Sequence, residues 1–320
     1  MTATTPPTDS RPSALLAWFD AWAAAERMGD VDDRRIDWMR VVPFLALHLA
    51  CFAVIAVGFG TFALVWATVL YFVRMFAITA IYHRYFSHRS FKLGRGWQFV
   101  FAVLGNASAQ RGPLWWAAHH RHHHRWSDTE HDTHSPTKDG FWWSHVGWIL
   151  TRKNFKTQVA RVPDLAKFPE LVFLDRFDAL VPMLMFAGSY AVGAWLEAAH
   201  PALHTNGPQL LVWTIVSTVV LFHATFTINS LAHVWGTRRY ATEDTSRNNL
   251  WLALLTLGEG WHNNHHRHQA STRQGFAWWE IDVSWYVLYA LSKVGVVRDL
   301  TPVPTAVLEE GGLRRGVDAP

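Results

Sequence analysis

Residues 41–82 decide the fold class of this chain, and they read VVPFLALHLACFAVIAVGFGTFALVWATVLYFVRMFAITAIY. Over these 42 residues the only Lys, Arg, Asp or Glu is Arg74. At about 1.5 Å per residue, two helices of roughly 20 residues would each cross a hydrocarbon core of about 30 Å. The break between them falls at Gly58-Phe59-Gly60-Thr61. We therefore predict a membrane hairpin with helices at about 41–58 and 61–82.

A second apolar pair follows in the second half of the chain. Residues 178–199 and 210–232 are each long enough to span a membrane, and the connection at 200–208 reads HPALHTNGP, a composition typical of turns. The sequence thus predicts an all-α integral membrane protein with four spanning helices in two hairpins. We expect three parts along the chain: a cytosolic, partly disordered segment (1–40), a membrane domain (41–300) and a loose C-terminal tail (301–320).

The distribution of Lys and Arg indicates on which side of the membrane each segment lies. The short hairpin connections, 58–61 and 199–209, contain neither residue, whereas segments 1–40, 83–177 and 233–320 hold 5, 14 and 9 of the 29. Short segments on the cytoplasmic side carry the excess of positive charge. We therefore place the N-terminus, the central segment and the C-terminus together in the cytoplasm.

Composition narrows the classes of function. Hydrophobic residues make up 50% of the chain, and charged residues only 17%, compared with roughly 25% in a soluble domain. A single cysteine, Cys51, excludes an internal disulfide framework and a cysteine-ligated zinc or iron–sulfur site. The sequence contains no nucleic-acid-binding motif. The apolar runs and the 19 histidines must therefore carry the functional interpretation.

The histidines cluster where predicted spans leave the membrane and in the segments between spans. Four motifs hold them: HRYFSH at 83–88, HRHHH at 120–124, NSLAH at 229–233 and HNNHH at 262–266. In HRHHH and HNNHH three histidines, His120, His123 and His124 in the first and His262, His265 and His266 in the second, stand at i, i+3 and i+4, positions that share one face of an α-helix. Asn229 and His233 are one turn apart. The two histidines of HRYFSH are five apart, about 140° around an α-helix, so we expect them to flank a site from one side.

With His122 set aside because it lies off that face, these motifs supply nine imidazoles, too many for one ion, since first-row metals take about four to six ligands. They fit two ions with room for O2. Imidazole suits iron, copper, zinc and nickel, and zinc has no redox chemistry, so we choose iron. Soluble di-iron bundles differ because they use carboxylate ligands. The competing interpretation is a surface tract that scavenges metal. The repeated spacing and the shared side of the membrane favour a built centre.

At these motifs the sequence resembles the membrane-bound fatty-acyl desaturases, most closely the Δ9 stearoyl-CoA (acyl-CoA) desaturase group. The resemblance covers about residues 41–300 and extends to four further segments: WSDTE at 126–130, HSP at 134–136, GFWWSHVGW at 140–148 and GEGWH at 258–262. It implies four membrane helices beneath a cytosolic helical cap. Two irons would lie at the junction, above a buried, kinked tunnel for the acyl chain.

Carried over residue by residue, the resemblance implies nine metal ligands: His83, His88, His120, His123, His124, His233, His262, His265 and His266. Asn229 would hold a metal-bound water. Gln110 and Thr225 match positions that line the bend of the tunnel. Arg152 and Lys153 match basic residues that contact the phosphates of the acyl carrier, a role that suits cations at a tunnel mouth.

Three positions depart from the acyl-CoA enzymes. Ala118-His119 replaces an Arg-Asp pair just before HRHHH, Arg111 replaces an Asn that contacts the carrier, and Phe226 replaces a Trp at the tunnel bend. None of these changes touches the motif histidines. They put the identity of the acyl carrier in doubt.

The resemblance implies an O2-dependent desaturase that introduces a cis double bond, at Δ9, into a saturated acyl chain, with acyl-CoA as the expected carrier. Electrons would come from a separate donor: a cytochrome b5-like protein, or a ferredoxin or rubredoxin with its reductase. An acyl-lipid desaturase and a hydroxylase of an acyl chain or alkane are alternatives on the same scaffold. A metal transporter is a further alternative, and it would need histidines and acids along the spans.

Overall fold

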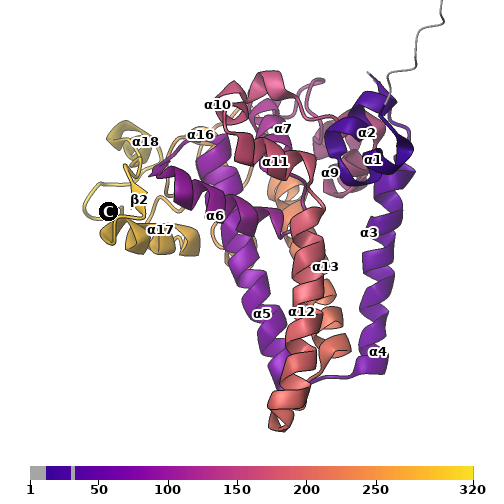
Figure 1. The fold of residues 1–320 in the computed structure, drawn as a ribbon. Coiled ribbons are helices and arrows are strands. Elements are labelled where there is room, and N and C mark those ends of the chain that lie inside the picture. Colours follow the sequence, from indigo (N-terminus) through magenta and orange to yellow (C-terminus); the bar gives the residue numbers. More distant parts are fainter. Residues whose placement is uncertain (1–11, 30–32, 320) are drawn as a thin grey trace, which may run out of the picture.

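Four long helices form a stem beneath a cap of shorter helices (Figure 1). The computed structural model describes residues 12–29 and 33–319. The disorder expected near the N-terminus falls mainly on residues 1–11, outside these ranges. Four helical segments are long and apolar enough to cross a membrane: Trp38–Val57, Thr61–Ser87, Leu180–Ala199 and Gly207–Val234. They overlap the four predicted spans, and the all-α integral membrane fold is confirmed.

The stem consists of two hairpins whose connections lie at the end far from the cap. Its elements are α3 (Trp38–Ala50), η1 (Cys51–Ala53), α4 (Val54–Val57), α5 (Thr61–Phe76), η2 (Ala77–Ser87), α12 (Leu180–Ala199), η6 (Pro201–Leu203), α13 (Gly207–Asn229) and α14 (Leu231–Val234). Gly58, at φ +71°, ends α4 in a conformation that favours glycine. Asn206 caps α13 by accepting a hydrogen bond from the backbone N–H of Gln209.

Arg74, the one charged residue predicted inside the first hairpin, is 1% exposed. Its guanidinium donates to the hydroxyls of Thr218 (2.6 Å) and Ser217 (2.8 Å) on α13. An unpaired cation inside a membrane span is unfavourable, and these two hydroxyls provide Arg74 with partners. The same bonds join α5 to α13. Farther from the cap, Ala63 and Ala67 of α5 pack against α13.

The cap is built from the segments before, between and after the hairpins. Its elements are α1 (Ala14–Phe19), α2 (Ala21–Met28), β1 (Lys92–Leu93), α6 (Arg95–Asn106), α7 (Pro113–Trp126), α8 (Pro136–Asp139), α9 (Phe141–His145), η3 (Gly147–Leu150), η4 (Arg152–Asn154), η5 (Val159–Arg161), α10 (Pro163–Ala166), α11 (Pro169–Arg176), α15 (Leu250–Leu255), α16 (His262–Arg267), α17 (Val283–Lys293), β2 (Val297–Arg298) and α18 (Thr305–Glu310). The strands β1 and β2 pair antiparallel, with Lys92 opposite Arg298.

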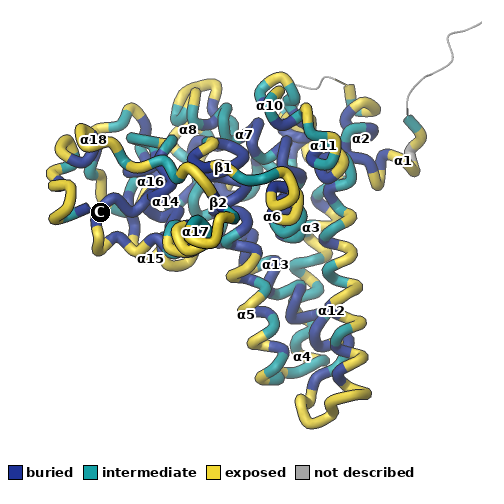
Figure 2. Tube along the Cα trace, turned by 60° about the vertical axis from the view of Figure 1, so that its left-hand side comes forward, coloured by how far each residue is buried: buried dark blue, intermediate teal, exposed yellow. Residues whose placement is uncertain are grey.

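Burial is concentrated where cap and stem meet, whereas the outer faces of the stem are exposed (Figure 2). Ile81 and Phe86 of η2 pack with Leu114 of α7 and Leu171 of α11 in the largest core cluster, and each is fully buried. On the stem, apolar side chains such as Ile55 (82% exposed) face outward. This pattern is the one expected for helices solvated by lipid tails.

The C-terminal segment corrects one expectation. Residues 301–320 were predicted to form a loose tail because they are rich in Pro and Gly, yet the described part of this segment is folded. Val307 and Leu308 of α18 are buried against Tyr240 and Phe276, and the Tyr240 hydroxyl donates to the carbonyl of Val307 at 3.0 Å. A few apolar positions, spaced to meet one aromatic pair, hold the segment in place.

Candidate metal centre

The nine histidines predicted as metal ligands lie in two groups at the junction of stem and cap. The five-histidine group contains His83, His88, His120, His124 and His265. The four-histidine group contains His123, His233, His262 and His266. Within each group, one ring nitrogen from every histidine lies within 4.8 Å of all the others. The structure thus brings together every histidine that the motifs singled out.

Helical spacing explains how the motifs divide between the groups. On α7, His120 and His124 are four residues apart and face the five-histidine group, whereas His123 faces the other. On α16 the assignment is exchanged: the first and last histidines of HNNHH face the four-histidine group and the middle one faces the five-histidine group. Residues i and i+3 of one helix point in slightly different directions, so α7 and α16 each contribute to both groups.

The expectation for His83 and His88 was wrong in geometry. They were predicted to flank the site about 140° apart, on the assumption of an α-helix. The segment Ala77–Ser87 is instead a π-helix. The backbone N–H of His88 donates to the carbonyl of His83 at 3.3 Å, an i→i+5 bond, and their ring centroids lie 4.9 Å apart. Such π-helical turns occur frequently at functional sites.

The ring nitrogens meet at distances that suit a shared cation. Nε2 of His265 lies 2.9 Å from Nε2 of His83 and 2.9 Å from Nε2 of His124, and Nε2 of His88 lies 2.8 Å from Nε2 of His120. Two ligands held about 2.1 Å from one ion at right angles would be about 3.0 Å apart. Facing lone pairs repel unless a cation lies between them. In the four-histidine group, Nε2 of His262 lies 3.2 Å from Nε2 of His233. The residues present therefore fit a metal ion in each group.

Carboxylates orient four of the nine rings through Nδ1. Glu259 contacts His83, Asp132 contacts His123 (3.0 Å), Asp128 contacts His233 (3.3 Å) and Asp244 contacts His266 (2.6 Å). A ring that donates its Nδ1–H to a carboxylate presents the Nε2 lone pair to a metal. The sequence interpretation missed these four acids. Their signal was proximity to the motifs, since Glu259 precedes HNNHH by three residues and Asp128 follows HRHHH by four.

Burial favours the neutral imidazole, the form that binds metal, at most of these rings; at His123 burial is outweighed by Asp132, and the pKa is raised. Burial lowers the pKa of His88, His120, His124 and His265 well below the ordinary histidine value. Burial also lowers the pKa of His266 to about 4, against the opposing effect of Asp244. For Asp244, burial acts to raise the pKa, but the hydrogen bond from His266 leaves it below the usual range.

The residues between the histidines anchor the motifs. In HNNHH, the Asn264 amide donates to the Gln274 carbonyl and to Glu280, both at 2.9 Å. The side-chain carbonyl of Asn263 accepts from the backbone N–H of Tyr240 at 2.8 Å. These bonds fix a helix of only six residues, which could not hold three histidines in place by its own stability.

The arginines of the other motifs have a similar structural role. Arg84, in HRYFSH, is 1% exposed and pairs with Asp282 at 3.0 Å. Arg121, in HRHHH, pairs with Asp164 at 2.7 Å and donates to the carbonyl of Phe86 at 2.7 Å. Arg121 thereby connects α7 to the end of η2. These two elements carry His83, His120 and His124 of the five-histidine group.

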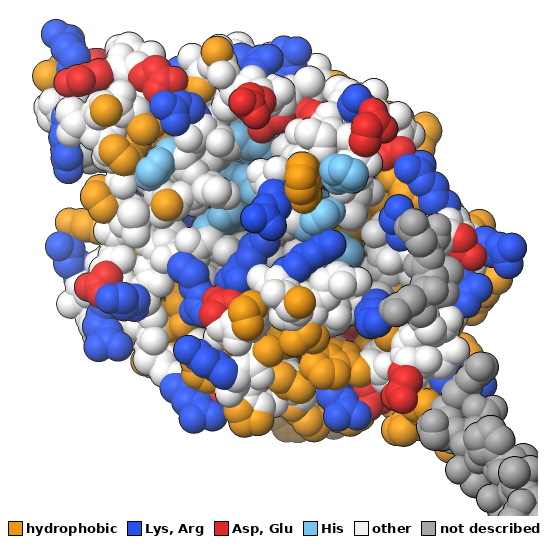
Figure 3. All heavy atoms as spheres, turned by 90° about the horizontal axis from the view of Figure 1, so that it is seen from above, with side chains coloured by type: hydrophobic (Ala, Val, Ile, Leu, Met, Phe, Trp, Pro, Cys, Tyr) orange, Lys and Arg blue, Asp and Glu red, His pale blue; other side chains and the backbone are white. Residues whose placement is uncertain are grey.

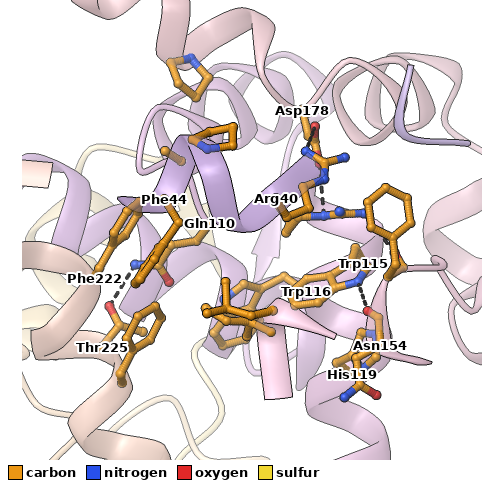
Figure 4. Close-up of a pocket in the computed structure, with 18 of the residues that line it drawn as sticks. Arg40, Phe44, Gln110, Trp115, Trp116, His119, Asn154, Asp178, Phe222 and Thr225 are labelled. Atoms are coloured by element: carbon orange, nitrogen blue, oxygen red, sulfur yellow. Dashed lines mark hydrogen bonds and ion pairs between the residues drawn. The ribbon is translucent and has the colours of Figure 1, made fainter. Parts of the chain in front are cut away.

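A large apolar cavity of about 260 Å³ lies beside the histidines (Figure 4). Gln110 and Thr225, predicted to line a tunnel bend, both line it side by side, and the Gln110 amide donates to the Thr225 hydroxyl at 3.0 Å. A smaller cavity of about 40 Å³ is lined by His83, His123 and His262. The two cavities share four lining residues: Trp116, His120, Thr225 and Asn229. An acyl chain that continued from the large cavity into the small one would reach histidines of both groups.

The remaining predicted site residues have different locations. Asn229, at the end of α13, borders both cavities. Arg152 and Lys153 lie on η4 and are not among the residues that line either cavity, although their neighbour Asn154 lines the large one. Arg111, one of the departures from the acyl-CoA enzymes, does line the large cavity.

Comparison with known proteins identifies the family. The fatty acid desaturase profile matches residues 60–294. This chain is a member of the fatty acid desaturase family. The chain is 35% identical over 274 residues to Delta-9 acyl-lipid desaturase 2 of Arabidopsis thaliana, covering 85% of each chain. It is 35% identical over 270 residues to the sn-1 stearoyl-lipid 9-desaturase of Anabaena variabilis, covering 83% of this chain and 94% of the relative.

A relative that uses a different carrier is equally similar. The icosanoyl-CoA 5-desaturase of Limnanthes douglasii is 36% identical over 270 residues, covering 82% of this chain and 72% of the relative. The desaturase family predicted from the histidine motifs is thus confirmed, and with it an O2-dependent oxidoreductase of fatty-acyl chains. The names of the relatives include both lipid and coenzyme A carriers, so they do not select between them.

Proposed function

We propose that this desaturase introduces a cis double bond, at Δ9, into a saturated acyl chain, using two iron ions held by the nine histidines. The observation that carries the proposal is a small cavity, lined by histidines of both groups, that shares four lining residues with a large apolar cavity. The overall reaction balances as one O2, two electrons and two protons from outside, and two hydrogens from the chain, giving one double bond and two waters.

In this proposal the five-histidine group and the four-histidine group each hold one iron. The second group has one ligand fewer. Asn229, which borders the small cavity with His123 and His262, would hold a water there as the further ligand. The irons supply the oxidising power that an unactivated C–H bond requires. The four carboxylates keep the rings in the tautomer that binds metal.

The chain's own residues determine position. No polar side chain can select one methylene among many, so the choice of carbon must come from cavity shape. Trp116, His120 and Thr225 line both cavities, and the Thr225 hydroxyl accepts a hydrogen bond from Gln110, which lines the large one. These four residues would fix how far the acyl chain passes the irons.

We propose that the cap is cytoplasmic, as are both termini. The connection between the first two spans, at 58–60, and the one between the last two, at 200–206, contain no Lys or Arg. Seen from the cap side, histidines are visible near the centre of the face among Lys and Arg side chains (Figure 3). A separate donor that docks on this face would deliver the two electrons.

The test is acyl-chain analysis after expression in a host whose lipids are saturated. We expect a new cis double bond at carbon 9, located by mass spectrometry of derivatised fatty acids. Hydroxylated chains without new double bonds would overturn the desaturase proposal in favour of a hydroxylase. His265→Ala is the matched inactive control, since this residue contributes to the five-histidine group.

A further inference from the structure

The large cavity is closed toward the surface of the cap. Trp115, His119 and Trp148 line it there and are 5%, 4% and 6% exposed. Trp115 and Trp148 stack with ring centroids 5.6 Å apart, and the Trp115 indole N–H donates to the Asn154 carbonyl at 2.8 Å. Asn154 and Phe155, the next lining residues, are each 4% exposed. A packed aromatic layer therefore separates the cavity from water on this side.

The same cavity is open toward the membrane. Among its lining residues, all within the described part of the chain, only Pro43 and Met183 are exposed, Met183 by 56%. Pro43 lies on α3 and Met183 on α12, and both helices are membrane spans. Leu47 and Phe186, about one turn further along each helix, line the cavity too and are partly exposed. The opening thus lies between α3 and α12, at the depth of the bilayer.

The packing of the stem explains why this side is open. α3 is attached to α13, since Nε2 of His48 lies 3.0 Å from Nε2 of His223 and the rings of Phe44 and Phe222 stack at 6.0 Å. α12 also packs on α13, and a Cβ at Gly193 would lie 2.3 Å from the carbonyl of Asn206. Both helices therefore pack on α13, and each contributes one exposed residue, Pro43 or Met183, to the lining of the cavity.

An ion pair closes the cap end of the gap. Arg40, on α3, lies 3.5 Å from Asp178, two residues before α12, and Asp178 also pairs with Arg111 at 3.0 Å (Figure 4). Below this cluster the walls of the opening are apolar. The arrangement is a polar band above an apolar slot, which matches the order of headgroup and acyl chain in one leaflet.

The closed end of the cavity contains polar atoms that lack a protein partner. Within the described residues, neither ring nitrogen of His119 nor the indole nitrogen of Trp148 forms a hydrogen bond, although both side chains are buried and line the cavity. A buried donor without a partner is unfavourable by about 1–3 kcal/mol. The oxygens of an acyl ester would supply acceptors there.

We propose that the substrate is the acyl chain of a membrane glycerolipid, which enters the cavity sideways from the bilayer between α3 and α12. Its ester oxygens would accept hydrogen bonds from His119 and Trp148, and its chain would pass Trp116 toward the histidines. This inference rests on the proposed desaturase function and names the carrier. An acyl-CoA would approach from water and meet the closed aromatic layer instead.

The first experiment compares the two carriers with the same chain. Iron-loaded protein in lipid nanodiscs of 1-stearoyl-2-oleoyl-phosphatidylcholine is given O2 and a reducing system, and the sn-1 chains are analysed for new double bonds. A parallel sample in nanodiscs without stearoyl chains receives stearoyl-CoA. We expect at least tenfold more product from the lipid. More product from stearoyl-CoA would overturn the lipid proposal and leave the desaturase function standing, whereas no product from either carrier would overturn the function itself.

The second experiment narrows the opening. Met183→Trp should lower the rate on the lipid at least tenfold, whereas Leu184→Trp should stay within twofold of wild type. Leu184 is the matched control because it is the next residue on α12, is 62% exposed and does not line the cavity. Pro43→Trp, with Leu45→Trp as its control, tests the facing wall. Equal rates for Met183→Trp and Leu184→Trp, at equal iron content, would overturn the lateral opening.

A binding measurement makes the test independent of turnover. Metal-free protein in nanodiscs that contain phosphatidylcholine with a diazirine at the middle of its sn-1 chain is irradiated, and labelled peptides are mapped. We expect label near Trp116 and Thr225, reduced at least fivefold in Met183→Trp and unchanged in Leu184→Trp. Label confined to the outer faces of the stem would contradict the proposal.

Discussion

The two histidine groups and the large cavity adjoin each other, yet they are held in place in different ways. Around the histidines, ring atoms are fixed by polar partners, as Asp132 fixes His123 and Asp244 fixes His266. Around the cavity, Phe44, Phe222 and Phe226 are held chiefly by packing. A directed bond is lost entirely when one partner is removed, whereas an apolar wall changes shape by degrees. We therefore expect large losses from changes in the first region and graded shifts from changes in the second.

The largest effect should follow from His265→Ala. This residue lies between His83 and His124 in the five-histidine group, with Nε2 contacts of 2.9 Å to both. We expect loss of about half the bound metal or more, and desaturation reduced at least a hundredfold. The measurement is elemental analysis together with acyl-product mass spectrometry. His268→Ala is the matched control, since His268 lies just beyond α16 and belongs to neither group.

A smaller loss should follow when an orienting carboxylate is neutralised. Asp244→Asn keeps the shape of the side chain but weakens the 2.6 Å contact with Nδ1 of His266. Changes to such partners reduce metal affinity or activity about 10–100-fold. Metal titration of the variant would measure this against Glu243→Gln, which alters an exposed neighbour. Equal affinity in both variants would show that Asp244 does not orient the ring.

A change in the cavity should redistribute products more than it reduces them. Thr225→Val keeps the volume of the side chain but removes the hydroxyl that accepts from Gln110 at 3.0 Å. We expect a shift in double-bond position or preferred chain length, with total activity lowered only about two- to fivefold. Thr227→Val, on the same helix outside both cavities, is the control. A product pattern identical to that of wild type would show that the bond between Gln110 and Thr225 does not position the acyl chain.

The smallest effect concerns pH. Burial lowers the pKa of His120 and His124 well below the ordinary value near 6.5, and that of His266 to about 4. Between about pH 4 and pH 6.5 the unfolded chain binds more protons than the folded one. The contribution of these histidines to the free energy of unfolding is therefore complete above about pH 6.5 and decreases as the pH falls toward 4. Thermal unfolding of metal-free protein should show Tm decreasing from pH 7 to 5. A constant or rising Tm would contradict this direction.

The sequence contained enough information for the spans and for the set of histidines. Span length follows from bilayer thickness, and the i, i+3, i+4 spacing of HRHHH and HNNHH brings imidazoles to one face. The spacing could not reveal the division between groups, because that depends on how α7 and α16 face each other. The predicted geometry of His83 and His88 was also wrong. Residues five apart come together in a π-helix, and η2 adopts that form in the fold.

The orienting acids and the cavity opening were beyond sequence reasoning for a related reason. Asp132 and Asp244 look like ordinary surface acids in the sequence; Asp128 and Glu259 lie close to the motifs, but only the tertiary fold shows which ring each one orients. The opening depends on α3 and α12 both packing on α13. The hydropathy of each helix taken alone does not show which helices pack together. Apolar residues at the opening, such as Met183, look the same in sequence as their lipid-facing neighbours.

The central claim is that two irons, one in each histidine group, carry out desaturation. The most direct test is metal analysis of anaerobically purified, iron-loaded wild-type protein, followed by a single exposure to O2 with reductant and mass spectrometry of the acyl chains. We predict two irons per chain and a new double bond in the chains. A preparation that forms the double bond with one iron per chain or none would contradict the claim.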